Sequence, residues 1–266
     1  MHHYRFYHDR KRANYLEAVK AMFDFFKVLK LQKSRMVNRI YGVKCVFWQP
    51  MPIIKIQEQT AGKVAGMLLQ IEAIKLSIEK PFTWSSGWKS PIYCDNRLSL
   101  SYPEIRTSIR DGLVQAIHEN FAAAEGIAGV ATAGIPQGTL VAEAMNLPFL
   151  YVRSKPKDHG MENLIEGRLT KGQKIVVVED LVSTGGSSLK VVEALRKEGA
   201  QVLGMVSIFN YGFDLATRNF YEADVSLISL SDFSHLLTYA HDQKFITEAQ
   251  LASLKAWRVD PAGWRK

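Results

Sequence analysis

The segment over residues 175–188, IVVVEDLVSTGGSS, constrains the fold more than any other part of this sequence. A short run of β-branched residues is typical of a buried strand in a parallel sheet. Two carboxylates, Glu179 and Asp180, end this run, and a Ser-Thr-Gly-Gly-Ser turn then opens the next helical pattern. Ligands of open α/β sheets bind beyond the carboxyl ends of the strands, where a glycine-rich turn offers backbone N–H groups to a phosphate. The segment therefore predicts a strand, a phosphate-binding turn and a helix in succession.

The side chains of this segment indicate what else the ligand carries. Hydroxyls at Ser183, Thr184 and Ser187 add hydrogen-bond donors beside the phosphate. The pair Glu179 and Asp180 cannot face a phosphate directly, so we expect it to accept hydrogen bonds from sugar hydroxyls and to help hold a Mg²⁺ hydration shell. In the alternative interpretation, Glu179 and Asp180 are solvated acids of a loop, and the glycines only form a turn that binds no ligand. The combination of two acids, three hydroxyls and two glycines favours a sugar-phosphate site, and the spacing is not that of a Walker A loop.

Helical and strand patterns alternate from about Met51 onward, as a parallel α/β sheet requires. Apolar residues at helical spacing predict helices over residues 60–78, 102–121, 139–145 and 188–197. Short apolar runs predict buried parallel strands over residues 127–131, 149–152, 175–178, 202–209 and 225–228. Residues 154–172 are polar and follow neither pattern, which is typical of a working loop.

The net charge of +8 is concentrated at the start of the chain. Residues 1–55 hold 12 Lys or Arg against 3 Asp or Glu, which leaves 22 against 23 for the rest. The main domain is therefore close to neutral, and we expect no nucleic-acid partner for it. The two cysteines, Cys45 and Cys94, are too few for a disulfide framework and too distant for a metal pair. With no apolar run long enough for a membrane span and no secretory signal, we expect a cytoplasmic protein with no membrane partner.

Residues 1–50 form a basic N-terminal extension with two interpretations. One face of a basic amphipathic helix, suited to a membrane surface or to organelle import, would hold Tyr15, Leu16, Val19, Met22, Phe23 and Phe26. However, residues 51–266 begin with Met51 and contain every motif described here. We favour the interpretation that residues 1–50 are not native and come from a misplaced start codon, and that residues 51–266 form the working domain.

The segment 175–188 resembles the signature that binds phosphoribosyl pyrophosphate (PRPP) in type I phosphoribosyltransferases. The resemblance implies an α/β fold with a central parallel sheet and a small N-terminal hood. The Thr-Ala-Gly-Ile turn at residues 132–135 is similar to the family's pyrophosphate loop. PRPP-binding residues implied by the signature are Glu179, Asp180, Leu181, Val182, Ser183, Thr184, Gly185, Gly186 and Ser187.

Two further stretches resemble orotate phosphoribosyltransferases, namely residues 82–97, FTWSSGWKSPIYCDNR, and residues 151–160, YVRSKPKDHG. Orotate is a flat carboxylated pyrimidine, and its site needs a ring to stack on and donors for its carboxylate. The resemblance implies that Tyr93 contacts the pyrimidine and that the Ser183 hydroxyl meets orotate. The alternative for Tyr93 is a core aromatic of a strand. The catalytic cations implied by the second stretch are Arg153, Lys157 and His159, at the start of a loop that closes over the reactants.

The same resemblance implies a homodimer with shared active sites, and Mg²⁺ bound through PRPP near Glu179 and Asp180 without a direct protein ligand. The sequence departs from the enterobacterial pattern, because Ser85, Ala133 and Ser154 replace lysines. An arginine that contacts orotate is also lost around Asn210. These departures affect individual contacts rather than the predicted activity.

The predicted reaction is a displacement at ribose C1 through a loose, oxocarbenium-like transition state. Asp180 and Glu179 hold the ribose hydroxyls, while Lys157, Arg153 and His159 counter the charge of the departing pyrophosphate. Lys157 and His159 both remain candidates for the proton donor. The alternatives are a phosphoribosyltransferase for another base, such as a purine, and a PRPP-sensing regulator that binds nucleic acid through the basic N-terminus.

Overall fold

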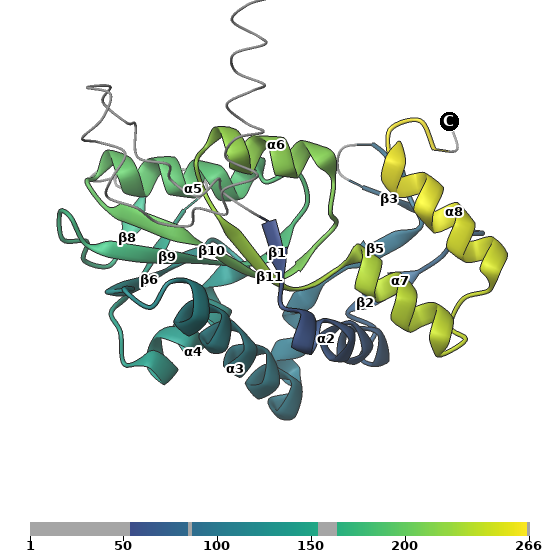
Figure 1. The fold of residues 1–266 in the computed structure, drawn as a ribbon, viewed down its shortest axis with the longest axis horizontal. Coiled ribbons are helices and arrows are strands. Elements are labelled where there is room, and N and C mark those ends of the chain that lie inside the picture. The colour runs from purple at the N-terminus through teal and green to yellow at the C-terminus, as the bar shows by residue number, and fades with distance from the viewer. Residues whose placement is uncertain (1–53, 85–86, 154–163, 265–266) are drawn as a thin grey trace, which may run out of the picture. The chain divides into compact units, whose positions relative to one another are not determined.

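A seven-stranded sheet forms the centre of the computed structural model, which describes residues 54–84, 87–153 and 164–264. Neighbouring strands pair in parallel, except for the antiparallel pair at the edge formed by β7 and β8. The spatial order is β1 (Ile54–Ile56), β11 (Leu227–Asp232), β10 (Gln201–Asn210), β9 (Lys174–Val182), β6 (Gly126–Val130), β7 (Phe149–Val152) and β8 (Ile165–Glu166). The predicted α/β class with a mostly parallel sheet is confirmed (Figure 1).

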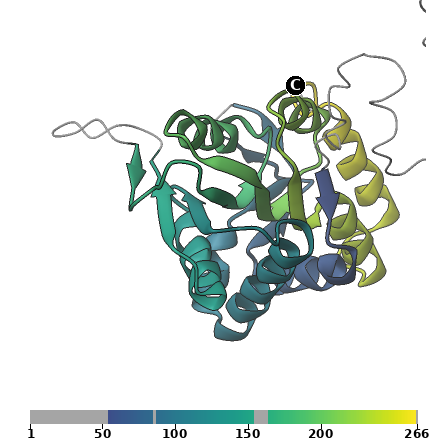
Figure 2. The same ribbon diagram turned by 60° about the vertical axis from the view of Figure 1, so that its left-hand side comes forward.

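Helices cover both faces of this sheet (Figures 1 and 2). One face carries α2 (Glu58–Gln70), α3 (Pro103–Asn120) and α4 (Gly134–Met145), and the other carries α5 (Gly186–Lys197) and α6 (Asp214–Glu222). Successive residues of β9 point to opposite layers. Val176 and Val178 pack into the core with the first group of helices, whereas Ile175 and Val177 pack with the second. This burial on both sides explains why the strand is a continuous apolar run.

The hood is built from two short antiparallel strand pairs, and the end of the chain packs beside it. Strand β2 (Ile74–Leu76) pairs with β5 (Ile92–Cys94), and β3 (Phe82–Thr83) pairs with β4 (Lys89–Ser90). The 3₁₀ helix η2 (Asn96–Ser101) returns the chain to the sheet, and α7 (Phe233–Asp242) and α8 (Glu248–Val259) pack beside the hood (Figure 1). Trp257 of α8 is fully buried, and its Nε1 donates to the Lys89 carbonyl at 3.2 Å.

The helix predicted over residues 60–78 is wrong in its second half. Helix α2 ends at Gln70, Glu72 takes a left-handed conformation with φ of 54°, and residues 74–76 form β2. The apolar spacing of Ile71, Ile74 and Ile78 suits a helix and a strand alike, so periodicity alone does not locate the break. The long loop over residues 154–172 also contains the two-residue strand β8. In the described parts of the chain, no helix has the length and apolar character needed to cross a membrane.

The described elements belong to one compact unit, Met51–Lys266, and residues 1–50 lie outside them. A chain that begins at Met51 keeps every described element, so we expect its free energy of unfolding to stay within about 0.5 kcal/mol of the full chain. A matched control begins at Gln59 and lacks β1 together with Gln57. The Gln57 amide donates to the Ser229 carbonyl at 2.9 Å, and its Nε2 donates to Glu119 at 2.8 Å.

We expect this control to lose about 2 kcal/mol or more, since it gives up these hydrogen bonds and the edge strand. Urea unfolding of the three chains measures the difference. An equal loss in the chain that begins at Met51 would show that residues 1–50 contribute to the fold.

Candidate functional site

The turn between β9 and α5 provides a phosphate-binding geometry. Gly185 is the N-cap of α5 with a left-handed φ of 81°, and a Cβ atom there would lie 2.6 Å from the Phe220 ring. Asn219 of α6 donates its Nδ2 to the Thr184 carbonyl at 2.8 Å and so holds the turn in place. No side chain caps the N-terminus of α5, while Gly186 and Ser187 are exposed. The first N–H groups of the helix are therefore available to an anion.

The two acids before this turn have different surroundings. Glu179 is only 5% exposed, and both of its oxygens are bonded within the protein. Its Oε2 accepts from Ser188 Oγ at 2.8 Å, and its Oε1 accepts from the Asp180 amide at 3.0 Å. Burial raises the pKa of Glu179 well above its usual range, and the charge of Asp180 adds to this rise. Glu179 is thus a protonatable anchor of the turn rather than a free carboxylate.

Asp180 lies where β9 meets the hood. Its carbonyl accepts from Asn96 Nδ2 at 2.8 Å, which ties η2 to the end of the strand. Burial raises the pKa of the Asp180 carboxyl, while the hydrogen bond from Glu179 and the positive charge of Arg97 act in the opposite direction. Arg97 itself forms a two-point ion pair with Asp95, with Nε to Oδ1 at 2.6 Å and Nη2 to Oδ2 at 2.9 Å. The end of β9 at Asp180 is thus tied to η2, which carries the Arg97 partner of Asp95.

Strand β5 brings Tyr93 and Cys94 to the same region. Tyr93 is 41% exposed, and its ring centroid lies 5.6 Å from that of Phe82. The alternative that Tyr93 is a core aromatic is therefore wrong, although its predicted contact with a base stays a prediction. Cys94 is a free thiol that donates to Asn96 Oδ1 at 3.2 Å. Burial raises the pKa of this thiol, and the charges of Asp180 and Asp95 raise it further.

The turn over residues 132–135 lies directly beside the end of β9. A Cβ atom on Gly134 would approach the Val178 carbonyl oxygen to 2.5 Å, so only glycine allows this contact. The peptide bond between Ala131 and Thr132 is cis. Gln137 on α4 is buried, its Nε2 donates to Ser99 Oγ at 3.3 Å, and its Oε1 has no partner among the described residues. Two of the loops predicted to bind phosphates thus meet at one edge of the sheet.

The remaining predicted residues are placed only in part. Arg153 follows β7, its amide donates to the Leu164 carbonyl at 2.8 Å, and its Nη1 lies 3.7 Å from Glu166 Oε1 at the base of the long loop. Asn210 is 3% exposed, and its Nδ2 has no partner within the described ranges. The predicted residues that lie outside the described residues are Lys157, His159, Ser85 and Ser154.

Sequence reasoning did not single out four residues that line this region. Asn96 and Arg97 close the stretch of residues 82–97 that carries the resemblance, so their position in that motif was a usable signal. Gln137 and Tyr211 had no such signal, because only the folded chain brings α4 and the end of β10 to the site.

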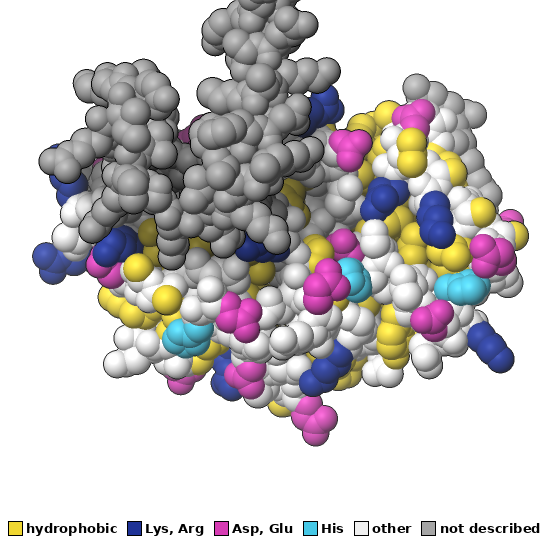
Figure 3. All heavy atoms as spheres, viewed as in Figure 1, with side chains coloured by type: hydrophobic (Ala, Val, Ile, Leu, Met, Phe, Trp, Pro, Cys, Tyr) yellow, Lys and Arg dark blue, Asp and Glu magenta, His cyan; other side chains and the backbone are white. Residues whose placement is uncertain are grey.

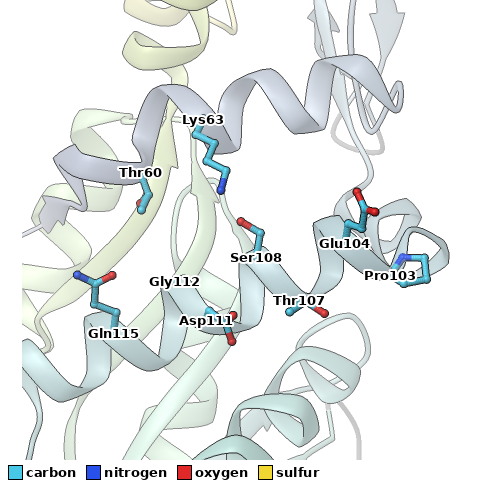
Figure 4. Close-up of a pocket in the computed structure, with 9 residues that line it drawn as sticks. All are labelled: Thr60, Lys63, Pro103, Glu104, Thr107, Ser108, Asp111, Gly112 and Gln115. Carbon is cyan, nitrogen blue, oxygen red and sulfur yellow. The ribbon is translucent and has the colours of Figure 1, made fainter.

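A separate groove of about 650 Å³ lies between α2 and α3, lined by Lys63, Glu104 and Ser108 among others (Figure 4). None of the predicted site residues lines it. Figure 3 shows acidic and basic side chains interspersed over this side of the molecule. The predicted site residues that the structure describes therefore lie at the sheet edge and not in this groove.

Known proteins are similar to this chain in sequence and in fold. The model of the phosphoribosyl transferase domain family matches residues 104–243. An orotate phosphoribosyltransferase of Cytophaga hutchinsonii is 59% identical over 204 residues, which cover 77% of this chain and 98% of the relative. The crystal structure of orotate phosphoribosyltransferase from Aeropyrum pernix is 28% identical with a TM-score of 0.57, over 66% of this chain and 97% of that chain. UMP synthase of Leishmania donovani is 26% identical with a TM-score of 0.64, over 74% of this chain and 42% of that one.

The buried carboxyl of Glu179 predicts a pH dependence of stability. Its pKa is higher in the folded than in the unfolded chain, so the folded state retains a proton that the unfolded chain releases. This stabilisation is complete at pH values below the pKa of an unfolded glutamate. It is lost as pH rises from that pKa through the higher pKa of the folded chain, and within this pH window the free energy of unfolding falls by about 1.4 kcal/mol per pH unit. Glu179→Gln keeps an acceptor for the Asp180 amide and has no proton to lose.

We therefore expect Glu179→Gln to flatten this dependence and to be more stable than the wild type above the window. Urea unfolding from about pH 4 to about pH 9 measures both effects. Glu193→Gln, on the exposed face of α5, is the matched control and should follow the wild type. If the free energy of unfolding of Glu179→Gln depended on pH as steeply as that of the wild type, Glu179 would not be the protonated anchor of the turn.

Proposed function

The chain belongs to the orotate phosphoribosyltransferase family, and we propose that it transfers the phosphoribosyl group of PRPP to orotate. The products are orotidine 5'-phosphate and pyrophosphate, in the biosynthesis of UMP. The observation that carries this proposal is the acid pair Glu179 and Asp180, followed by an uncapped helix N-terminus at the carboxyl end of β9. The family relationship and this geometry support the same substrate class.

Binding of PRPP uses two features of the turn. The 5'-phosphate binds the N–H groups at the start of α5 and the hydroxyls of Ser183, Thr184 and Ser187. The Asp180 carboxylate accepts hydrogen bonds from the ribose hydroxyls, and Glu179 holds Asp180 in place through the Asp180 amide. This division of work follows from the bonds of Glu179, both of whose oxygens accept hydrogen bonds within the protein. Leu181 and Val182 contribute backbone groups and packing.

The reaction needs no covalent nucleophile. As the bond between ribose C1 and pyrophosphate breaks, positive charge develops on the sugar. Orotate N1 forms the new bond to C1 from the opposite side and releases its N1 proton, so that orotidine 5'-phosphate, pyrophosphate and one proton are produced. The turn over residues 132–135 faces the departing pyrophosphate, and Arg153, Lys157 and His159 of the long loop counter its charge. Exclusion of water by this loop protects the oxocarbenium-like sugar from hydrolysis.

Mg²⁺ fits this site as a partner of PRPP. Among the described residues, no three His, Cys, Asp or Glu side chains gather into a metal-binding group. Both Glu179 oxygens are bonded within the protein, which leaves Asp180 as the acid that would contact the ion's hydration shell. When bound, Mg²⁺ neutralises charge on the pyrophosphate leaving group.

We place the enzyme in the cytoplasm as a homodimer whose active sites are shared. The long loop leaves the sheet at β7 and returns at β8, and the described Arg153 guanidinium pairs with Glu166 rather than with the acid pair. A loop anchored in this way suits delivery of its cations to the neighbouring subunit. Residues 1–50 take no part in this site in our proposal.

The first test of the function is the loss of orotate absorbance when purified protein, PRPP and Mg²⁺ are mixed. We expect Asp180→Asn to fold normally and to lose about 100-fold or more in kcat/KM for PRPP, since it loses the charge that holds the ribose. Asp242→Asn, at the exposed end of α7, is the control and should retain activity. Turnover of purine bases in place of orotate would contradict the proposed substrate, and near wild-type kinetics of Asp180→Asn would remove the acid from the mechanism.

The shared site predicts rescue between two inactive variants. Mixed dimers of Lys157→Ala and Asp180→Asn hold one doubly damaged site and one intact site. Random exchange of subunits should therefore restore roughly a quarter of wild-type activity, as a two-fold symmetric dimer requires. Subunit exchange is verified separately with tagged chains. A mixture that exchanges and stays as inactive as its parents would show that Lys157 acts within its own chain.

A further inference from the structure

Asp180 lies on a part of β9 that runs beyond its neighbour β6. The strand pairing between β6 and β9 ends at Gly129 and Val178, whereas the pairing between β10 and β9 continues to Asn210 and Val182. Among the described strands, β9 beyond Val178 therefore has a partner on one side only. The position of Asp180 depends on contacts from other parts of the chain, since its main-chain polar groups need partners on the open side as well.

Side chains bind both main-chain polar groups of Asp180. Glu179 Oε1 accepts from the Asp180 amide at 3.0 Å, and Asn96 Nδ2 donates to the Asp180 carbonyl at 2.8 Å. Asn96 lies 84 residues earlier in the sequence and is only 1% exposed. Breaking a hydrogen bond at such a buried position leaves a polar group without a partner, which is costly. The bond therefore holds η2 and the end of β9 in one relative position.

The same side-chain amide also binds the hood. Asn96 Oδ1 accepts from Cys94 Sγ at 3.2 Å, and Cys94 follows Tyr93 in β5. Because only the amide nitrogen can donate and only the oxygen can accept, these two contacts fix the orientation of the amide. A single side chain thus joins the strand that carries Tyr93 to the strand that carries Asp180.

A chain of buried hydrogen bonds supports Asn96 from the side of α4. Ser99 Oγ donates to the Asn96 carbonyl at 2.6 Å, and Gln137 Nε2 donates to Ser99 Oγ at 3.3 Å. Both of these side chains are buried. Gln137 belongs to the first turn of α4, directly after the turn over residues 132–135. The contacts therefore run without a break from that turn through η2 to Asp180.

We propose that Asn96 is a positioning residue for the transfer reaction, which holds Asp180 in place relative to Tyr93 and to the turn over residues 132–135. This inference rests on the proposed function, in which these three parts meet the ribose, the base and the pyrophosphate. Asn96 acts through Asp180 and not through a contact with a reactant. Displacement at ribose C1 requires base, sugar and leaving group in line, so a small shift of Asp180 lowers the rate of the chemical step more than it weakens binding.

Asn96→Asp tests the proposal because it keeps the size of the side chain and an acceptor for Cys94. It replaces the Nδ2 donor by an oxygen, which cannot bind the Asp180 carbonyl. We expect kcat to fall about 10-fold to 100-fold, while KM for orotate and KM for PRPP stay within about threefold of the wild type. Asn96→Leu, which has a similar volume and no charge, should show the same fall. Steady-state kinetics measure these values on protein whose folding is verified by urea unfolding.

Asn120→Asp is the matched control. Asn120 Nδ2 also donates to a backbone carbonyl, that of Ala116 at 2.9 Å, but it does so at the end of α3. The control loses the same kind of bond and should keep the kcat of the wild type. A fall in kcat as large as that of Asn96→Asp would show that the effect is structural only, and would overturn the proposal.

Ser99→Ala is a second test, which leaves the Asn96 amide in place and decides the question if the Asn96 variants do not fold. We expect its kcat to fall about threefold to tenfold, since it removes one supporting hydrogen bond. Wild-type kcat in folded Asn96→Asp, or in Ser99→Ala where the Asn96 variants do not fold, would overturn the proposal. Wild-type protein that consumes no orotate would overturn the proposed function together with this inference, whereas active wild type with unaltered variants overturns the inference alone.

Discussion

The buried carboxyl of Glu179 is the constraint on which the rest of the site depends. It joins the last buried residues of β9 to the first turn of α5, by accepting hydrogen bonds from the Asp180 amide and from Ser188 Oγ. The chain between these contacts must therefore form a tight turn, which Gly185 permits through its left-handed backbone. This arrangement leaves the uncapped N-terminus of α5 and Asp180 at the same edge of the sheet, where we propose that a sugar phosphate binds.

The hood is attached to this edge by a few hydrogen bonds and one aromatic cluster. Asn96 reaches the Asp180 carbonyl, and the Tyr211 amide reaches the Val182 carbonyl, so both sides of the site are tied to the end of β9. Trp257 from the last helix fills the space behind Trp84 and Tyr211. The last helix thus packs behind the hood and the end of β10, although it lies far along the chain from residues 175–188.

The parts of the fold and of the candidate site that could be predicted are those set by residues close together in the sequence. The strand, turn and helix over residues 175–188 were predicted because β-branched residues, glycines and hydroxyls each act on their own neighbours. Helix α3 was predicted for the same reason. The end of α2 was missed because the spacing of Ile74 and Ile78 suits the period of a helix and that of a strand alike. The point where the helix ends depends on how this segment packs against the hood. The positions of Asn96 and Tyr211 depend on contacts between distant segments, and no short pattern reports those.

Amide hydrogen exchange with and without PRPP and Mg²⁺ tests most directly where the sugar phosphate binds. Binding at the end of β9 predicts strong protection of the amides over residues 181–188, with no change in α8. Ribose 5-phosphate alone should protect the same turn, since it carries the phosphate and the ribose hydroxyls. Protection confined to the groove between α2 and α3, or none over residues 181–188 at saturating PRPP, would contradict the placement of the active site at this edge.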